Sequence, residues 1–390
     1  MVFSIFLLTM AFPVIMFPVN IVMFVKDKKH SKTYAFLIAL AFAAVAFNFA
    51  PTPDQNTDIL RHYVTMYRAH SHTFASALTS DAFESLMGYY VLLKVFSYAK
   101  MPVILPTFIT LVGYYILIYM VSKLDKNNNI FDRFVTLYLL LCCVSFLGFC
   151  SGIRQYTVFV LFIVTFYMEI KYKKLKPVAY LIYILLVTLH TSVVLIIMMR
   201  LVVELIFKLR TSKIFLWLVL LWGLFQTLFV DILDSLFGGN VIVDAILSMS
   251  EFYEANGSDV ILPNYIWRMT LLLCCFLVVL KLKKKCGIDK HLSRTYVMFC
   301  LVVCMFTLGA VTNYDVFARF SMFAAMLIIP LLPSFLKDFR PQKRVVFYLG
   351  IVCCESLVLL YNITQYMTFN FNSIGEILST NIFTILGGIA

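Results

Sequence analysis

The chain has 390 residues, of which 62% are hydrophobic and only 13% are charged. A soluble domain is about half apolar and about a quarter charged, so this composition excludes an ordinary soluble protein and indicates that lipid surrounds most of the surface. The net charge of +12 would suggest nucleic-acid binding in a soluble protein, but here the basic residues lie mainly in short loops between apolar segments and indicate membrane topology instead.

Twelve apolar segments approach the length of about 20 residues that a helix needs to cross the hydrocarbon core. They are 3–25, 33–50, 103–122, 134–150, 155–170, 177–190, 192–208, 214–230, 264–280, 295–312, 320–336 and 345–362. The first has no basic leader and no small-residue cleavage site, so we expect it to be a retained span. We predict an all-α polytopic membrane protein with about 12 transmembrane helices, forming a single transmembrane domain over residues 1–390.

Short basic loops predict the orientation of these spans. Six loops hold 24 of the 32 Lys and Arg residues, and the most basic is 281–294. Positive charge stays on the cytoplasmic side of a membrane, so we expect these loops in the cytoplasm and both termini outside. The segment 231–263 carries six acidic residues and no Lys or Arg, which indicates an external loop.

Residues 51–102 are predicted to form a second, larger external region. Its part 84–100 is long enough for a short span, but a crossing there would place the basic loops 171–176 and 281–294 outside. We therefore expect 84–100 to form an interfacial or re-entrant helix. A re-entrant backbone is tolerated only where protein or water covers it, so 51–102 and 231–263 are expected to cap the active-site cavity.

The first external region holds a mixed cluster of charged and aromatic residues: Asp58, Arg61, His62 and Tyr63. Asp58 and His62 are four residues apart and share one face of a helix. Sugar sites combine carboxylates with aromatic platforms, so this pattern favours sugar binding; the alternative is a solvated amphipathic helix. Glu84 lies near the start of the next helix, where the alternative role is that of an N-terminal charge.

Arg154 follows a helix-breaking Ser-Gly pair in Ser151-Gly-Ile-Arg-Gln155 and is expected to open the next span. A helix N-terminus favours anions through its free N–H groups and its dipole, and a guanidinium can grip phosphate oxygens with its planar fork. This corner therefore predicts a phosphate site. The alternative is an interfacial arginine that reaches lipid headgroups.

His190 lies in Leu189-His-Thr-Ser192, at the end of a span of only fourteen residues. It therefore falls at a break near the predicted external face, where an imidazole can act as a general base or donate to a phosphate. The alternative is a histidine that bonds the backbone of a helix hairpin.

Arg319 follows Tyr314 and Asp315 and is expected just before the span 320–336, again on the external side. Its alternative role is a weak ion pair with Asp315, four residues earlier. Arg200 and Glu204 are also four residues apart, and we expect them to pair within one helix.

The order of these features resembles the EpsG-like/Wzy-type family of bacterial polysaccharide polymerases, over residues 50–335. Four places carry the resemblance: Asp58-Ile-Leu-Arg-His-Tyr63; Glu84-Ser-Leu-Met-Gly-Tyr-Tyr90; Ser151-Gly-Ile-Arg-Gln155 followed by Leu189-His-Thr-Ser192; and Phe317-Ala-Arg-Phe-Ser321. One departure is Ala50-Pro-Thr-Pro53, which stands where the family has a Gly-rich turn and so bears on the role of Asp58.

The resemblance implies a metal-independent glycosyltransferase that joins undecaprenyl-pyrophosphate-linked oligosaccharide units at the external face of the bacterial inner membrane, for O-antigen, capsule or exopolysaccharide. It needs no cofactor and no nucleotide sugar. Arg154 and Arg319 would hold the leaving pyrophosphate, with His190 as the base or a further pyrophosphate contact. The implied substrate-binding residues are Asp58, Arg61, His62, Tyr63, Glu84, Gln155 and Tyr314. The expected partners are the lipid-linked oligosaccharides and the bilayer, with a chain-length regulator left open and no nucleic acid.

Two other functions compete with this interpretation. A lipid-linked oligosaccharide flippase or another transporter would place charges at the midplane and often shows internal duplication, whereas here the charges cluster on the predicted external side and no repeat is evident. An O-antigen ligase-like glycosyltransferase would use similar chemistry and differ in its acceptor.

Overall fold

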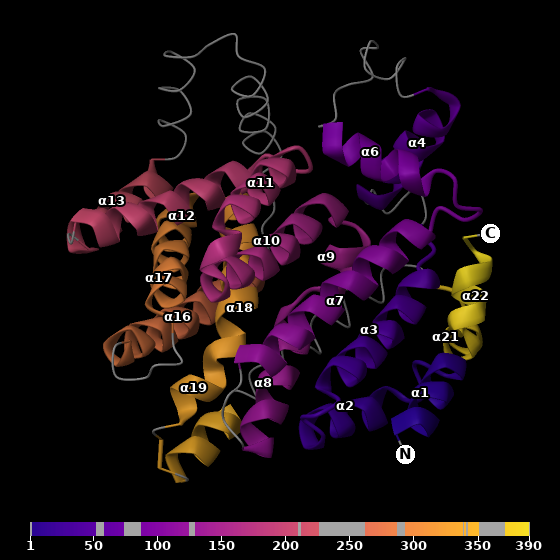
Figure 1. Ribbon diagram of the computed structural model, residues 1–390, viewed down its shortest axis with the longest axis horizontal. Coiled ribbons are helices and arrows are strands. Elements are labelled where there is room, and N and C mark those ends of the chain that lie inside the picture. The colour runs from indigo at the N-terminus through magenta and orange to yellow at the C-terminus, as the bar shows by residue number, and fades with distance from the viewer. Residues whose placement is uncertain are drawn as a thin grey trace. The chain divides into compact units, whose positions relative to one another are not determined.

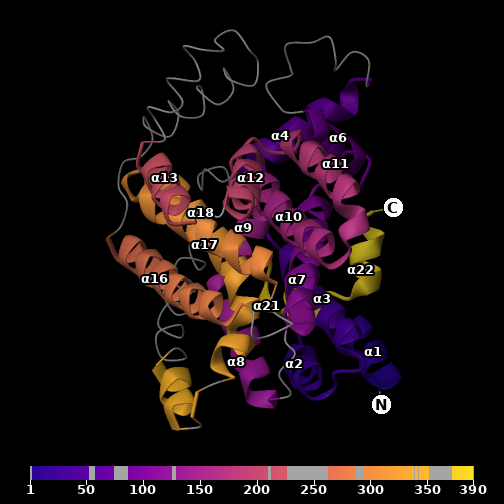
Figure 2. The same ribbon diagram turned by 60° about the vertical axis from the view of Figure 1, so that its left-hand side comes forward.

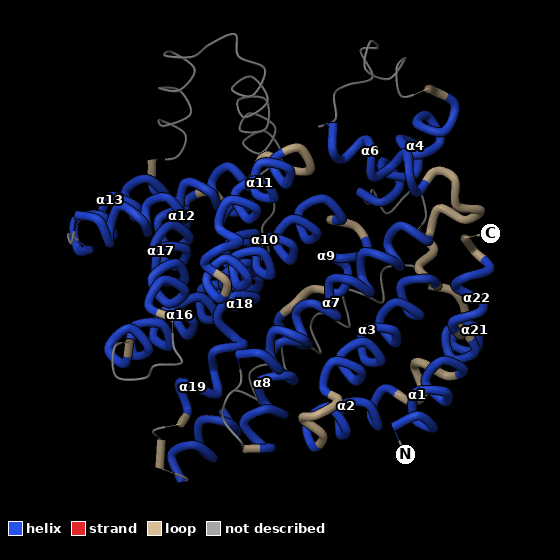
Figure 3. The backbone as a smooth tube through the Cα atoms, viewed as in Figure 1, coloured by secondary structure: helices blue, strands red, loops and turns tan. Residues whose placement is uncertain are grey.

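A computed structural model describes residues 2–51, 58–73, 87–124, 129–209, 212–225, 262–286, 293–337, 339–340, 342–350 and 371–389. Within these ranges the regular elements are helices, and the one strand-like contact is an isolated bridge between Phe49 and Phe371 (Figure 3). Glu84, the acidic segment 231–261 and residues 351–362 of the predicted last span lie outside the described residues.

Five helices in the described ranges are long and apolar enough to cross a membrane. They are Ile104–Leu124, Ile153–Lys171, Tyr265–Lys284, Arg294–Thr312 and Tyr314–Leu336. Shorter apolar helices accompany them, among them Val2–Ala11 and Met87–Phe96. The prediction of an all-α, multi-pass membrane protein is confirmed.

The chain folds as two compact units. The first comprises Met1–Val164, Ile184–His190 and Leu336–Ala390, and the second comprises Thr165–Tyr183 and Thr191–Phe335. Helices of the first unit are α1 (Val2–Ala11), α2 (Phe17–Lys26), α3 (Ser31–Phe47), α4 (Asp58–Ser71), α6 (Met87–Phe96), α7 (Ile104–Leu124), α8 (Ile130–Cys143), α9 (Phe146–Cys150), α21 (Ile374–Ser379) and α22 (Ile382–Gly387). Helices of the second are α12 (Ser192–Leu209), α13 (Ser212–Leu224), α16 (Leu262–Lys285), α17 (Arg294–Gly309) and α18 (Tyr314–Ile328), followed by α19 (Leu332–Leu336), whose last residue belongs to the first unit. Helices α10 (Ile153–Lys171) and α11 (Lys176–Val187) contribute residues to both units.

The core of the first unit is the contact between α3 and α7, which lie side by side in Figures 1 and 2. Ala35, Ala39 and Ala43 recur every four residues along α3 and are fully buried. Small residues at this spacing let helix backbones approach closely in a membrane protein. The ring of Phe42 on α3 stacks on that of Tyr114 on α7, with centroids 4.0 Å apart.

The N-terminal segment is not the continuous span that we expected over residues 3–25. It forms two helices of 10 residues each, α1 and α2. Pro13 lies in the break and has no backbone N–H to donate, which disfavours a continuous helix. The Nδ2 of Asn20 donates to Thr9 Oγ1 at 3.1 Å, although these positions would be about 16 Å apart along a straight helix. The chain therefore bends between α1 and α2.

In the second unit, α17 packs against α12, α13, α16 and α18. Its contact with α13 depends on a glycine from each helix. A Cβ atom added to Gly223 would collide with the carbonyl oxygen of Phe306, and one added to Gly309 would collide with that of Leu220. Each glycine thus lies directly on the backbone of the other helix, which side chains at these positions would hold apart.

Candidate functional site

Helix α4 divides the predicted acid–base–aromatic cluster between a buried and an exposed face. His62 lies on the buried face with Ile59 and is only 6% exposed. Asp58 and Arg61 form an ion pair with each other, and their side chains are 47% and 67% exposed. The four residues therefore do not converge on one point: the histidine faces the protein, whereas the ion pair lies at the surface.

Helix α6 begins with Met87-Gly-Tyr-Tyr90, one of the segments that carry the family resemblance, and it is attached to the link between α11 and α12. The backbone N–H of Tyr89 donates to the carbonyl oxygen of Thr188 at 3.2 Å. A Cβ atom at Gly88 would collide with the Thr188 hydroxyl, so a glycine is needed at this close approach. The described part of α6 has 10 residues, and the interfacial or re-entrant helix expected over 84–100 stays a prediction.

The Arg154 corner has the predicted conformation. Helix α9 ends at Cys150, the Ser-Gly pair breaks the chain, and α10 begins at Ile153, so that Arg154 is the second residue of the new helix. The preceding span, predicted as one helix over 134–150, is instead broken between α8 and α9. Ser145 caps α9 by accepting a hydrogen bond from the backbone N–H of Gly148 at 3.1 Å.

These elements meet around the side chain of Tyr89. The guanidinium of Arg154 lies over the Tyr89 ring, 4.9 Å from its centroid, and the Tyr89 hydroxyl contacts Nδ1 of His62. His62 also hydrogen-bonds the backbone of Ser151, within the Ser-Gly break. Three of the segments that carry the family resemblance thus meet in the first unit. They meet at Tyr89, for which the sequence alone indicated no role. We call His62, Tyr89 and Arg154 the triad cluster.

Burial determines the protonation of the triad cluster. It lowers the pKa of His62 from its ordinary value of 6.5 to about 3, and the positive charge of Arg154 acts in the same direction. Burial also raises the pKa of Tyr89, although Arg154 opposes that shift. His62 is therefore neutral at physiological pH, so one ring nitrogen accepts a hydrogen bond while the other donates one. The single full charge in the triad cluster is the guanidinium.

Several buried polar atoms on these segments have no hydrogen-bond partner in the described part of the chain, and two of them bear on the site. These two are the Nε2 of Gln155, beside Arg154 in sequence, and the hydroxyl of Tyr63, beside His62. Burial raises the pKa of the Tyr63 hydroxyl, so it remains a donor at neutral pH. Buried groups of this kind are normally satisfied by protein, water or ligand, which makes both suitable for binding a polar substrate.

His190 lies where the sequence predicted, in the break between α11, which ends at Val187, and α12, which begins at Ser192. Its side chain is 7% exposed. It belongs to the first unit and follows Thr188, the residue that holds the start of α6. The α11–α12 link thus contains both His190 and Thr188, which accepts the hydrogen bond from Tyr89 of the triad cluster.

Arg319 and Tyr314 belong to the second unit. We expected Arg319 to lie just before its helix, but this prediction is wrong. Helix α18 already begins at Tyr314, so Arg319 lies within it. Asn313 caps this earlier start by accepting a hydrogen bond from the backbone N–H of Val316 at 3.2 Å. The ring of Tyr314 stacks on that of Tyr265, with centroids 5.9 Å apart. Arg268 donates to the Ala318 carbonyl oxygen at 2.9 Å, so a second arginine lies on this helix start.

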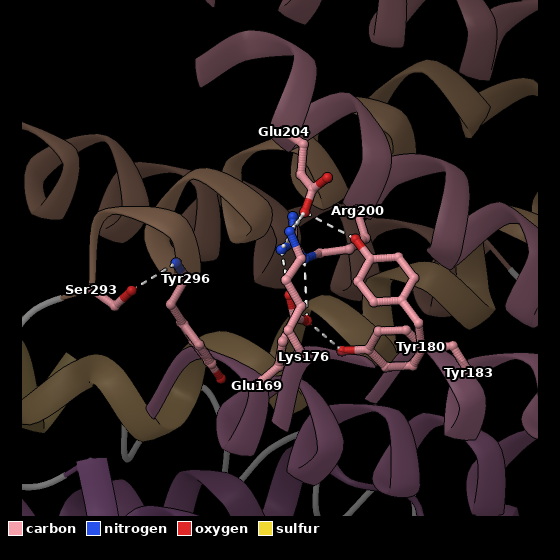
Figure 4. A network of polar contacts seen from close by, with 8 residues as sticks. All are labelled: Glu169, Lys176, Tyr180, Tyr183, Arg200, Glu204, Ser293 and Tyr296. Atoms are coloured by element: carbon pink, nitrogen blue, oxygen red, sulfur yellow. Dashed lines mark hydrogen bonds and ion pairs between the residues drawn. The ribbon is translucent and has the colours of Figure 1, made fainter. Parts of the chain in front are cut away.

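A separate polar network joins α10, α11 and α12 in the second unit (Figure 4). The Nη2 of Arg200 donates to Glu169 at 2.5 Å and to Glu204 at 3.1 Å, and Lys176 lies 2.7 Å from Glu204. The hydroxyls of Tyr183 and Tyr180 donate to Glu169 and Glu204 respectively. The predicted pair of Arg200 with Glu204 is confirmed, but its buried partner is Glu169. Two acids and two bases balance, which indicates a structural role.

The fold and the site define the class of this chain: a multi-pass, all-α membrane protein with a buried basic–aromatic cluster at a helix start. A family model, that of the EpsG family, matches residues 55–373. The chain belongs to this family of Wzy-type polysaccharide polymerase-like membrane proteins, which confirms the resemblance seen in its motifs. No curated protein and no solved structure matches the chain.

Proposed function

We propose that this protein is a glycosyltransferase that joins undecaprenyl-pyrophosphate-linked oligosaccharide units at the external face of the bacterial inner membrane. Family membership supports a polysaccharide polymerase. The observation that carries the finer proposal is the position of Arg154, at the start of α10 and over the Tyr89 ring. In the described part of the chain this arginine has no carboxylate partner.

A pyrophosphate fits this corner on chemical grounds. The first N–H groups of a helix have no partner within the helix, and its dipole favours anions there. A guanidinium adds a planar pair of donors that matches phosphate oxygens. The Tyr89 ring restricts the arginine from one face, so fewer conformations are lost when an anion binds. We assign Arg154 to the pyrophosphate of the donor; for Arg319, in the second unit, the same role is proposed from the family resemblance alone.

The reaction then needs one nucleophile and one leaving group. The acceptor hydroxyl oxygen forms a bond to the anomeric carbon of the growing chain, while the bond from that carbon to the pyrophosphate oxygen breaks. The hydroxyl proton passes to His190, and the lipid pyrophosphate leaves as an anion held by Arg154. Charge that develops on a leaving group is stabilised most by donors already in place.

The remaining residues are proposed to orient sugars. Gln155 and Tyr63 offer the unpartnered donors described above. His62 already bonds Tyr89 and the backbone of Ser151, so its proposed part is to position the Tyr89 ring against Arg154. Asp58, Arg61, Glu84 and Tyr314 complete the proposed substrate-binding set.

Reconstitution with a lipid-linked repeat unit tests the proposal. Liposomes with the wild-type protein should yield a ladder of lengthening products on a gel, and Arg154→Ala or Arg319→Ala should yield single units only. Arg68→Ala is the matched control, because Arg68 is an exposed arginine of α4 with no assigned role. A normal ladder from Arg154→Ala would overturn the proposal. Transfer of the lipid-linked unit across the bilayer without a ladder would favour the flippase instead.

A further inference from the structure

A cavity of about 590 Å³ lies in the second unit among α12, α16 and α17. These helices are neighbours in Figures 1 and 2, and α17 packs against each of the other two. The volume is within the range of about 300–1,000 Å³ that small-molecule sites occupy. None of the residues assigned to sugar transfer lines it, so it calls for a separate explanation.

The walls of this cavity have two distinct chemistries. Four side chains are apolar: Ile206, Phe207, Val297 and Met298. Two are cationic, Lys283 at the end of α16 and Arg294 at the start of α17. No acidic side chain is among the described lining residues.

Arg294 is placed toward the apolar wall. Its guanidinium lies 5.4 Å from the centroid of the Phe207 ring, so one face of the group is packed and its edge stays available for hydrogen bonds. It is also the first residue of α17, after the cap Ser293, where the helix dipole adds positive potential. An anion at this edge would meet a guanidinium, an ammonium and a helix start.

The two apolar spans of these helices indicate the depth of the cavity in a membrane. One span runs over Tyr265–Lys284 and the next begins at Arg294, so Lys283 and Arg294 mark the ends of two neighbouring membrane crossings. Phosphate groups of lipids lie at that depth, and acyl chains begin just inside it. The basic content of this loop indicates the cytoplasmic side.

We propose that this cavity binds an anionic phospholipid. Its phosphate would lie between Lys283 and Arg294, and the part of an acyl chain nearest the headgroup would lie on the Phe207 side. A free inorganic anion would leave the four apolar side chains in contact with water, whereas a phospholipid satisfies both walls at once. Basic pockets between helices on the cytoplasmic side bind anionic headgroups for this reason. The assignment does not depend on the proposed sugar-transfer reaction.

Native mass spectrometry of the full-length protein tests the assignment. Phosphatidylglycerol should bind more tightly than phosphatidylcholine of the same acyl chains, and Lys283→Gln/Arg294→Gln should weaken phosphatidylglycerol binding about thirtyfold. Lys284→Gln is the matched control, since Lys284 is an exposed neighbour on α16 that does not line the cavity. Equal binding of the two lipids, or an equal loss in the control, would overturn the proposal.

Alkylation of Cys286 tests the same proposal in the wild-type protein, so it does not depend on whether the double variant folds. It also lines the cavity, so in nanodiscs its alkylation by a maleimide, followed by peptide mass spectrometry, should be slower with phosphatidylglycerol than with phosphatidylcholine alone. Protection by inorganic phosphate in detergent to the same extent would identify a free-anion site and overturn the lipid. No protection by either would also overturn it.

Discussion

At the scale of single residues, we expect the role of Arg154 to depend on the shape of its guanidinium as well as on its charge. A lysine at 154 keeps the positive charge but has neither the planar fork nor the stacking face that meets Tyr89. We expect Arg154→Ala to lower the polymerisation rate by about 100-fold or more, the usual cost of removing a transition-state donor. Arg154→Lys should recover only a small part of that rate. Initial rates from reconstituted protein, normalised to the inserted amount, measure both variants.

His62 makes the packing of α4 sensitive to acid. Its pKa is about 3 in the folded protein and 6.5 ordinarily, so the unfolded chain binds the proton first. The stabilisation is complete above pH 6.5 and is lost as pH falls toward 3. At pH 5 the loss amounts to about 2 kcal/mol.

The variant His62→Gln keeps a polar side chain without the titration. Between pH 7.5 and pH 5, the melting temperature of the wild type should therefore fall more than that of His62→Gln. Thermal unfolding in detergent measures the difference at each pH. Parallel curves for the two proteins would show that His62 is not the group whose protonation weakens the fold.

At the scale of elements, the start of α10 could be predicted, whereas the start of α18 and the breaks inside apolar segments could not. The Ser-Gly pair before Arg154 is a local signal, because glycine and serine disfavour continuing the helix, and α10 begins where it indicated. The break between α1 and α2 was missed because average hydropathy over 3–25 is high whether or not Pro13 interrupts the helix. Tyr89 was missed because its role depends on His62 and Arg154, which are distant in sequence.

The glycine contact of α13 with α17 gives a prediction at this scale. Gly309→Ala should lower stability by about 1–3 kcal/mol, as overpacking does, because the new Cβ meets only backbone atoms of Leu220 and Leu224. Gly350→Ala is the matched control, since nothing lies within 4 Å of a Cβ at that position. Thermal unfolding of both variants should separate them. Equal melting temperatures would mean that α13 moves away without cost.

The polar network of α10, α11 and α12 predicts that removing one charge of a buried ion pair destabilises the protein more than removing both charges. Glu169→Gln leaves Arg200 buried with less compensation, which should cost about 3–5 kcal/mol. Removing both residues as Glu169→Leu/Arg200→Met leaves Glu204 with Lys176, a balanced pair. The double variant should therefore be more stable than Glu169→Gln. Unfolding in denaturant compares the two; a double variant less stable than the single one would contradict this account.

At the scale of the whole molecule, the all-α membrane class and the family could be predicted from the sequence. Both depend on features that can be read along the chain without a structure: the length of apolar segments, the charge of loops and the order of motifs. The number of crossings could not, because bends such as the one between α1 and α2 depend on a hydrogen bond of Thr9 with Asn20 across the break. Loop charge still constrains the orientation of the chain, because it is summed over many positions rather than taken from one helix.

That orientation gives the last prediction. Ser71, exposed at the end of α4, should face outside, and Cys286 should face the cytoplasm, because a reversed chain would carry most of its Lys and Arg residues across the membrane. In a background without other cysteines, Ser71→Cys should react with an impermeant maleimide in intact spheroplasts. Cys286 should react only after permeabilisation. Cys274, exposed on the apolar helix α16, should stay unlabelled in both conditions if lipid covers it. Labelling of Cys286 in intact spheroplasts would reverse the topology, and the proposed external site would then face the cytosol, where flipped lipid-linked sugars are absent.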